Sequence, residues 1–193
     1  MRHGPRSARR IALTFDDGPG PLTVQVLDAL AERGARATFN VLGERVADHP
    51  QLIERIMREG HELGSHAFHH DRLAGRPLRA YRQLARTDAT LRAVTGVAPR
   101  VFRPPYGAWS RGMVLAARAA GLVTVNWDVS PRDWERPGAE AIRDRVVSGA
   151  RPGTIVVLHD ERRASEQTPA AVREILRDLG GYEFVTVSEL LGL

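Results

Sequence analysis

Two kinds of apolar segment alternate along the chain. Short runs rich in β-branched residues predict buried strands at 11–15, 37–41, 62–65, 101–103, 123–127, 154–158 and 184–187. Longer segments whose apolar residues recur every three or four positions predict amphipathic helices at 21–34, 49–60, 76–96, 110–121, 138–149 and 168–181. Most of these helices run into a glycine, as is common just past a helix C-terminus: Gly34, Gly60, Gly96, Gly121, Gly149 and Gly180. The alternation indicates repeated βα units.

Repeated βα units favour an α/β fold with a mostly parallel sheet. Seven strands with helical crossovers fit a distorted or incomplete (β/α) barrel better than a doubly wound sheet, because no phosphate-binding glycine fingerprint follows the first strand. A flavodoxin-like sheet, which can also lack that fingerprint, stays open as the alternative. No composition break or long linker divides the chain, so we predict a single domain over residues 1–193.

The composition excludes several classes of function. All 28 basic residues are arginine, which excludes mechanisms that need a Schiff-base or phosphate-loop lysine. The net charge of +5 could attract nucleic acid, but the arginines are spread along the chain instead of forming one basic cluster. Because the arginines are not clustered, we predict no nucleic-acid partner. Cysteine is absent, so neither disulfides nor thiolate metal ligands can form.

The sequence contains no evident export or membrane segment. The basic N-terminus is followed only by the short apolar segment 11–15 before two acids, which is far from the apolar region of a signal peptide. No run approaches the ~20 apolar residues that span a bilayer. The location stays unknown: cytoplasmic for the sequence as written, extracellular or cell-wall if a signal was trimmed. We expect a monomer without a membrane span.

Polar residues suited to chemistry fall at the carboxyl ends of the predicted strands. In chain order they are Asp16 and Asp17 after the first strand, His66 and His70 after the third, Arg103 at the fourth, Asp133 after the fifth and His159 at the sixth. In a parallel barrel these strand ends converge on one face, where active sites are found. Residues far apart in the sequence are therefore expected to meet in one cleft.

A histidine pair predicts a metal site. His66 and His70 are four positions apart, a spacing that puts two imidazoles on one side of a helical turn, within reach of one ion. Asp17 would complete a His-His-Asp set and leave positions open for water and substrate, as catalytic zinc sites require. His69 is expected to point elsewhere. Such a pair alone is more often a surface feature, and the acids on neighbouring strand ends favour the metal site.

Two further pairs of residues have the chemistry needed for proton transfer. Asp16 would lie beside the metal without binding it, which is the position of a general base, and Arg103 could hold its orientation and charge. His159 is the candidate proton donor to a leaving amine. Asp133 could bond the other ring nitrogen of His159, fix its tautomer and raise its pKa.

The loop 102–110 and the sixth predicted strand suggest substrate contacts. Two prolines stiffen the loop, which could hold a backbone N–H of Tyr106 against a developing oxyanion. Trp109 could form a wall of the substrate groove by stacking, although simple packing is about as plausible. Leu158 would offer an apolar wall for a small acyl methyl group.

In combination these segments resemble a known family. TFDDGP, HAFHH, RPPYG, RDW and LHD resemble the five ordered motifs of the polysaccharide deacetylases, the NodB-homology domain of carbohydrate esterase family four. The match runs from Thr14 to the FVTVSELL segment near the C-terminus. The resemblance implies that Asp17, His66 and His70 bind one divalent metal ion, with Zn²⁺ expected and Co²⁺ or another divalent ion as the alternative.

The resemblance also implies roles for the remaining site residues. Asp16 would be the base and Arg103 its tether, and the Tyr106 amide would stabilise the oxyanion. His159 would be the general acid with Asp133 as its partner. Trp134 would form the acetate pocket together with Leu158.

Two positions depart from the family pattern. Ala67 stands where the second motif usually has a serine or threonine that steadies the loop, which puts metal affinity in question and not the identity of the ligands. Ser130 stands where the fourth motif usually opens with an acid. We expect the second change to shift activity or local rigidity without abolishing catalysis.

The expected activity is metal-dependent removal of N-acetyl groups from glycans that contain N-acetylglucosamine, such as chitooligosaccharide, chitin or peptidoglycan, with release of acetate. An O-acetyl esterase acting on xylan and an amidohydrolase acting on a small acylated metabolite remain as enzymatic alternatives. A metal-holding carbohydrate-binding module without turnover is a third, although such a module needs no base and acid beside its metal.

Overall fold

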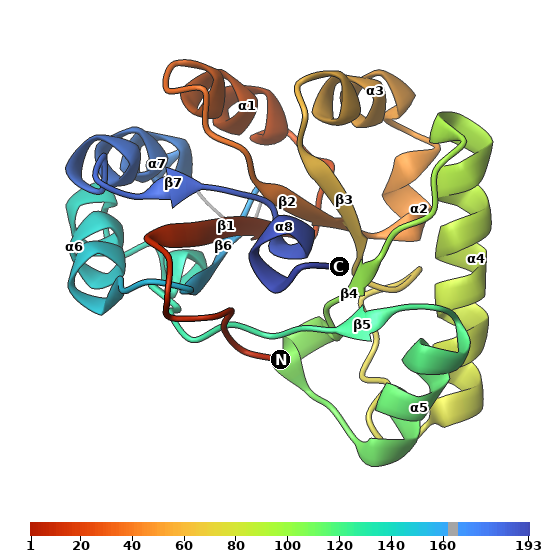
Figure 1. Ribbon diagram of the computed structural model, residues 1–193. Coiled ribbons are helices and arrows are strands. Elements are labelled where there is room, and N and C mark those ends of the chain that lie inside the picture. Colours follow the sequence, from red (N-terminus) through yellow and green to blue (C-terminus); the bar gives the residue numbers. More distant parts are fainter. Residues whose placement is uncertain (162–165) are drawn as a thin grey trace.

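The computed structural model of the chain describes residues 1–161 and 166–193. A curled parallel sheet lies at its centre, with helices packed along the outer side (Figure 1). The strands are β1 (Arg10–Asp16), β2 (Thr38–Val41), β3 (Glu62–Ser65), β4 (Val101–Phe102), β5 (Val123–Thr124), β6 (Ile155–His159) and β7 (Glu183–Phe184). Their order across the sheet is β5-β4-β3-β2-β1-β6, and β7 pairs with the beginning of β1.

The sheet curls into an incomplete barrel, as the sequence predicted. After β5, at one edge of the sheet, the chain crosses to the other edge, where Val129 forms a parallel bridge with Val156 of β6. The crossing is visible in Figure 1 below the centre of the sheet. It brings the two edges together, so the carboxyl ends of the strands surround one region.

The helices include all six that the sequence predicted and two that it missed. Those predicted are α1 (Thr23–Ala31), α3 (Pro50–Arg58), α4 (Pro77–Thr95), α5 (Arg111–Ala119), α6 (Ala139–Gly149) and α7 (Gln167–Asp178). Those missed are the short α2 (Gly43–Val46) and α8 (Val187–Leu191), and two 3₁₀ turns are η1 (Pro105–Gly107) and η2 (Asp133–Glu135). No helix within the two described ranges is long and apolar enough to cross a membrane.

Most predicted element boundaries differ from the observed ones by a residue or more, and three of these differences have the clearest consequences. The predicted strand 123–127 ends at Thr124, and the predicted strand 184–187 ends at Phe184. A capping box explains the second case, since the Thr186 side chain accepts from the amide of Glu189 while the Glu189 carboxylate accepts from the amide of Thr186. This cap starts α8 where β-branched residues suggested strand. Gly149 is the last residue of α6 and does not follow the helix.

Successive side chains of β1 point to opposite faces of the sheet, and this decides which of them reach the site. Ile11, Leu13 and Phe15 are buried in the core between the sheet and the outer helices. Because residues two apart on a strand share a face, Thr14 and Asp16 lie on the inner side of the curl. The strand therefore supplies its apolar side chains to the core and one carboxylate to the interior.

Candidate active site

The position of Asp16 follows from strand register. It is the last residue of β1, is 2% exposed, and lies opposite Asn40 of β2 and His159 of β6. Its Oδ1 accepts a hydrogen bond from Asn40 Nδ2 at 2.8 Å and another from Arg103 Nη1 at 2.9 Å. Both partners bind the same oxygen, Oδ1, and Asp16 is one of the residues that line the cleft described below.

Arg103 is fully buried and forms the ion pair that the sequence suggested. Besides Asp16, its Nη1 donates to Thr14 Oγ1 and its Nη2 to the backbone oxygen of Asn126. The guanidinium lies over the Trp127 ring, 5.6 Å from the ring centroid. The buried guanidinium therefore fixes the orientation of the Asp16 carboxylate and places a positive charge beside it.

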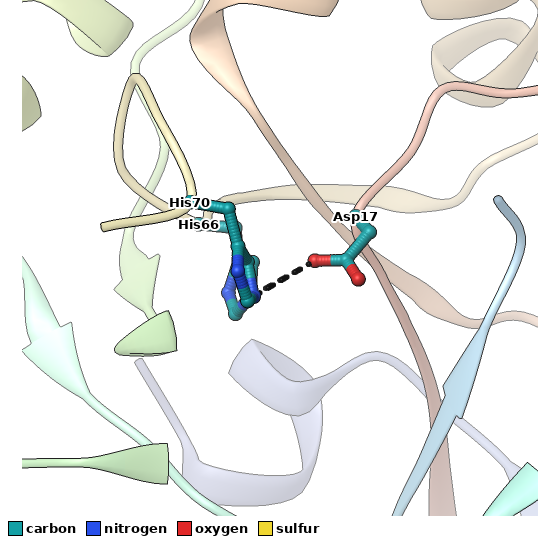
Figure 2. A group of neighbouring side chains, drawn as sticks. All are labelled: Asp17, His66 and His70. Carbon is teal, nitrogen blue, oxygen red and sulfur yellow. Dashed lines mark ion pairs between the residues drawn. The ribbon is translucent and has the colours of Figure 1, made fainter. Parts of the chain in front are cut away.

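Asp17 and the two histidines form one cluster, shown in Figure 2. Asp17 Oδ1 lies 3.3 Å from Nε2 of His66 and 3.3 Å from Nε2 of His70. The three ligand atoms lie within 4.8 Å of one another. Asp17 Oδ1 is buried and makes no hydrogen bond to the described residues. One carboxylate oxygen and two imidazole nitrogens that lie this close together are suitable ligands for a divalent cation.

Hydrogen bonding orients His66 for this role. Its Nδ1 lies 2.8 Å from the backbone oxygen of Arg103, so this nitrogen carries the proton and donates it. Nε2 is the ring nitrogen that faces Asp17, and in its deprotonated form it can bind a metal ion, which is the arrangement found for metal-binding histidines. One residue, Arg103, thus holds the candidate base through its side chain and a candidate ligand through its backbone.

The expectation of a helical turn between the two ligand histidines is wrong. Residues 66–70 form neither helix nor strand: a bend lies at residues 68–70, and Ala67 adopts φ 70°. The carbonyls of Ala67 and Phe68 accept hydrogen bonds from the amides of Gly43 and Glu44 at the start of α2, instead of closing a helical turn. His69 is exposed and contacts Glu44, so it points away from the cluster as expected.

The electrostatic environment keeps Asp17 ionised. Burial alone raises the pKa of its carboxyl group, but the close contact with His66 and the positive charges of His66, His70 and His159 outweigh burial. The pKa of Asp17 is therefore held well below its ordinary value. A carboxylate that stays ionised at low pH is available as a metal ligand over a wide pH range.

His159 and Asp133 form a second pair across the cleft. Asp133 is fully buried, and its Oδ1 lies 2.8 Å from His159 Nδ1. Its Oδ2 accepts from the His159 backbone amide and from Thr168 Oγ1. Burial lowers the pKa of the His159 imidazole, but the hydrogen bond and charge of Asp133, with the charges of Asp16 and Asp17, raise it to about 9. His159 is therefore protonated near neutral pH.

One cleft of about 570 Å³ is lined by Asp16, Asp17, His66, His70 and His159. Its aromatic walls are Tyr106, Trp127 and Trp134, with the Tyr106 ring 4.4 Å from the His70 ring and the Trp134 ring 5.2 Å from the His159 ring. Gly107 permits the approach of Trp127, since a Cβ at this residue would lie 2.6 Å from the indole and φ is 61°.

Two expected substrate contacts are not at this cleft. Leu158 is fully buried in the core between sheet and helices, and Val157 lines the cleft instead. The reason is the strand period of two, which puts Val157 and not Leu158 on the same face of β6 as His159. Trp109 is 58% exposed and lines a separate pocket with Met1 and Arg2.

Sequence reasoning missed four residues of the site. Asn40 and Val157 left usable signals, because an amide residue stands one position before the end of an apolar strand and a valine lies two positions before His159. Trp127 and Arg136 left none, since both reach the cleft from loops. Of the two departures noted above, Ser130 has a buried hydroxyl oxygen without a partner among the described residues.

Comparisons place this arrangement among known proteins. The sequence model of the family described as polysaccharide deacetylase matches residues 3–125. The chain is 44% identical over 166 residues to a chitooligosaccharide deacetylase of Sinorhizobium fredii, covering 83% of this chain and 77% of that protein. It is 41% identical over 192 residues to a peptidoglycan-N-acetylglucosamine deacetylase of Bacillus cereus, covering 97% and 90%.

A solved structure agrees with the sequence comparisons. The crystal structure of the Bc1960 peptidoglycan N-acetylglucosamine deacetylase, in complex with 4-naphthalen-1-yl-N-oxidanyl-benzamide, superimposes with a TM-score of 0.94. The two sequences are 32% identical, and the alignment covers 99% of this chain and 92% of that one. The curled sheet and its outer helices are therefore shared with this enzyme.

Proposed function

The chain belongs to the polysaccharide deacetylase family, carbohydrate esterase family four, and on that premise we propose that its site removes N-acetyl groups from N-acetylglucosamine-containing glycans and releases acetate. One observation carries the proposal. The His-His-Asp cluster is flanked in a single cleft by a buried, paired carboxylate and by a histidine held protonated by a buried aspartate. A base, an acid and a cation site in one cleft suit amide hydrolysis.

We assign the metal site to Asp17, His66 and His70, and the ion to Zn²⁺, for which two imidazoles and one carboxylate are a common catalytic ligand set. When bound, the ion supplies electrophilic stabilisation of the acetyl carbonyl oxygen and makes water a stronger nucleophile. Co²⁺ is the alternative. Treatment with a chelator is expected to abolish turnover, and Zn²⁺ is expected to restore it.

The base in this scheme is Asp16. It accepts a proton from the attacking water as the water oxygen forms a bond to the acetyl carbon. Arg103 and Asn40 hold its Oδ1, so the carboxylate keeps one orientation through the cycle. No large rearrangement is then required at the moment of proton transfer.

The acid is His159. Breaking the C–N bond leaves a nitrogen that needs a proton, and the protonated imidazole donates it, so that acetate and a free amino sugar are the products. We assign the Tyr106 amide to the developing oxyanion, since Tyr106 lines the cleft at φ 61° and its turn uses the next two amides internally. Val157 and Trp134, beside His159, would hold the acetyl methyl group.

The proposal is tested by acetate release. Metal-free and Zn²⁺-loaded protein are incubated with chitooligosaccharide, peptidoglycan and acetylated xylan, and acetate is measured. We expect release from the N-acetylated glycans by the loaded protein only. Release from xylan alone would make the protein an O-acetyl esterase. Sugar binding without acetate from any substrate would indicate a binding module.

The Asp133–His159 pair predicts a specific pH dependence. Because the pKa of His159 is raised to about 9, the protonated acid is present below that pH and is lost as pH rises through it. Asp133→Asn removes the charge that raises this pKa. We expect the alkaline limb of the kcat profile to move down by roughly one pH unit or more.

A matched control separates charge from packing in this experiment. Thr168→Val removes a hydrogen bond to Asp133 Oδ2 but leaves the carboxylate in place. Its alkaline limb is expected to stay near that of the unmodified protein. An unmoved limb in Asp133→Asn would contradict the assignment of His159 as the acid.

A further inference from the structure

The segment that carries both histidine ligands has little structure of its own. Between His66 and His70 the backbone bends instead of forming a helix or strand, and Ala67 adopts a left-handed conformation that only a minority of non-glycine residues adopt. This segment is nevertheless buried from residue 66 to residue 68. Buried backbone amides need partners, and these must come from outside the segment.

Gln83 supplies the partner for two of these amides. It lies on α4, well after the histidines in sequence, and is 8% exposed. Its Oε1 accepts from the backbone N–H of Phe68 at 3.2 Å and of His69 at 2.9 Å. One side-chain oxygen thus fixes two consecutive peptide groups between the ligands.

The orientation of the Gln83 amide is itself fixed. Its Nε2 donates to Asp71 Oδ2 at 2.8 Å, and the same oxygen accepts from Arg79 Nη2 at 2.6 Å. A flipped amide would turn its NH₂ group toward two N–H donors and its oxygen toward a carboxylate, which excludes the flip. Asp71 follows His70 directly, so the network holds the segment at its middle and at its end.

We propose that Gln83 is a positioning residue of the metal centre. By binding the amides of Phe68 and His69 and the carboxylate of Asp71, it sets the backbone path that brings the His66 and His70 rings toward Asp17. The proposal rests on the metal site of the proposed function and does not depend on which acyl group is hydrolysed. Groups that orient metal ligands from outside typically change metal affinity 10–100-fold when removed.

The test measures metal affinity in place of turnover. Full-length metal-free protein is titrated with Zn²⁺ in competition with a chromophoric chelator. Gln83→Leu keeps a side chain of similar size but leaves both amides without their acceptor. We expect its Kd for Zn²⁺ to rise roughly 10–100-fold.

A control on the same helix separates positioning from general stability. Leu91 is fully buried on α4 in the core beneath the sheet and outside the Gln83 network. Leu91→Ala is expected to lower the thermal stability of the metal-free protein through a cavity, with a Kd for Zn²⁺ within about threefold of the unmodified protein. An equal loss of affinity in both variants would reduce Gln83 to an ordinary structural residue.

A paired exchange provides a rescue. Gln83→Glu keeps an oxygen for the two amides but faces the Asp71 carboxylate, so we expect weakened Zn²⁺ binding. Adding Asp71→Asn restores a donor between the two side chains, and the Kd is expected to return toward its original value. Unchanged affinity in Gln83→Leu, or no rescue in the paired variant, would overturn the proposal. If the unmodified protein bound no Zn²⁺, the proposed metal site would fail and this inference with it.

Discussion

Asp16→Asn is expected to lower kcat by roughly 10²–10⁴ while the protein still binds one Zn²⁺ ion. The amide has almost the shape of the carboxylate, so the contacts of Oδ1 with Asn40 and Arg103 can persist. What disappears is the ability to accept a proton. Initial rates of acetate release and elemental analysis of the purified variant measure the two quantities separately.

Two further variants sharpen this result. His159→Ala is expected to cause a loss of similar size, also with metal retained, because it removes the proton donor. The double variant Asp16→Asn/His159→Ala is expected to lose far less kcat than the product of the two single losses, since the effects of groups that act in one reaction are not additive.

Asp28→Asn is the control. Asp28 is an exposed acid on α1 that pairs with Arg55, and its substitution should leave kcat unchanged. Near-normal turnover in Asp16→Asn and His159→Ala would refute both assignments.

Asp17→Ala is expected to remove the bound metal, and with it all measurable turnover. Asp17 supplies the one carboxylate group of the cluster found among the described residues. Two histidines alone are too few for a tight site, so we expect metal content to fall from about one ion per chain to roughly none. Elemental analysis after gel filtration measures the content, and circular dichroism checks that the variant is folded.

The contrast between Asp16 and Asp17 is the informative part of these experiments. The two acids are adjacent in sequence, yet Asp16 continues the strand while Asp17 has φ 74°, which turns its side chain toward the histidines. Substituting one should remove proton transfer, and substituting the other should remove the ion. If Asp17→Ala retained one ion with unchanged affinity, the cluster of Asp17, His66 and His70 would not be the metal site.

Much of the fold could be predicted because its signals are local. Strand 62–65 was predicted with the bounds it has in the structure, and all six long helices were found, since apolar periodicity depends only on neighbouring residues. The parallel sheet followed from the alternation of these elements. The short helices α2 and α8 were missed because one turn of helix leaves almost no periodic signal.

The sequence by itself determined which residue types stand at the strand ends, and hence that Asp16, Asp17 and the histidine pair would share one face. Tertiary structure alone decided which side chains meet there. Trp127 reaches the site from a loop and Gln83 from α4, and neither contact is indicated by the period of a strand or helix. Sequence patterns record the period of each element, whereas contacts between elements depend on how the sheet curls and on the backbone paths of its loops, which no single segment encodes.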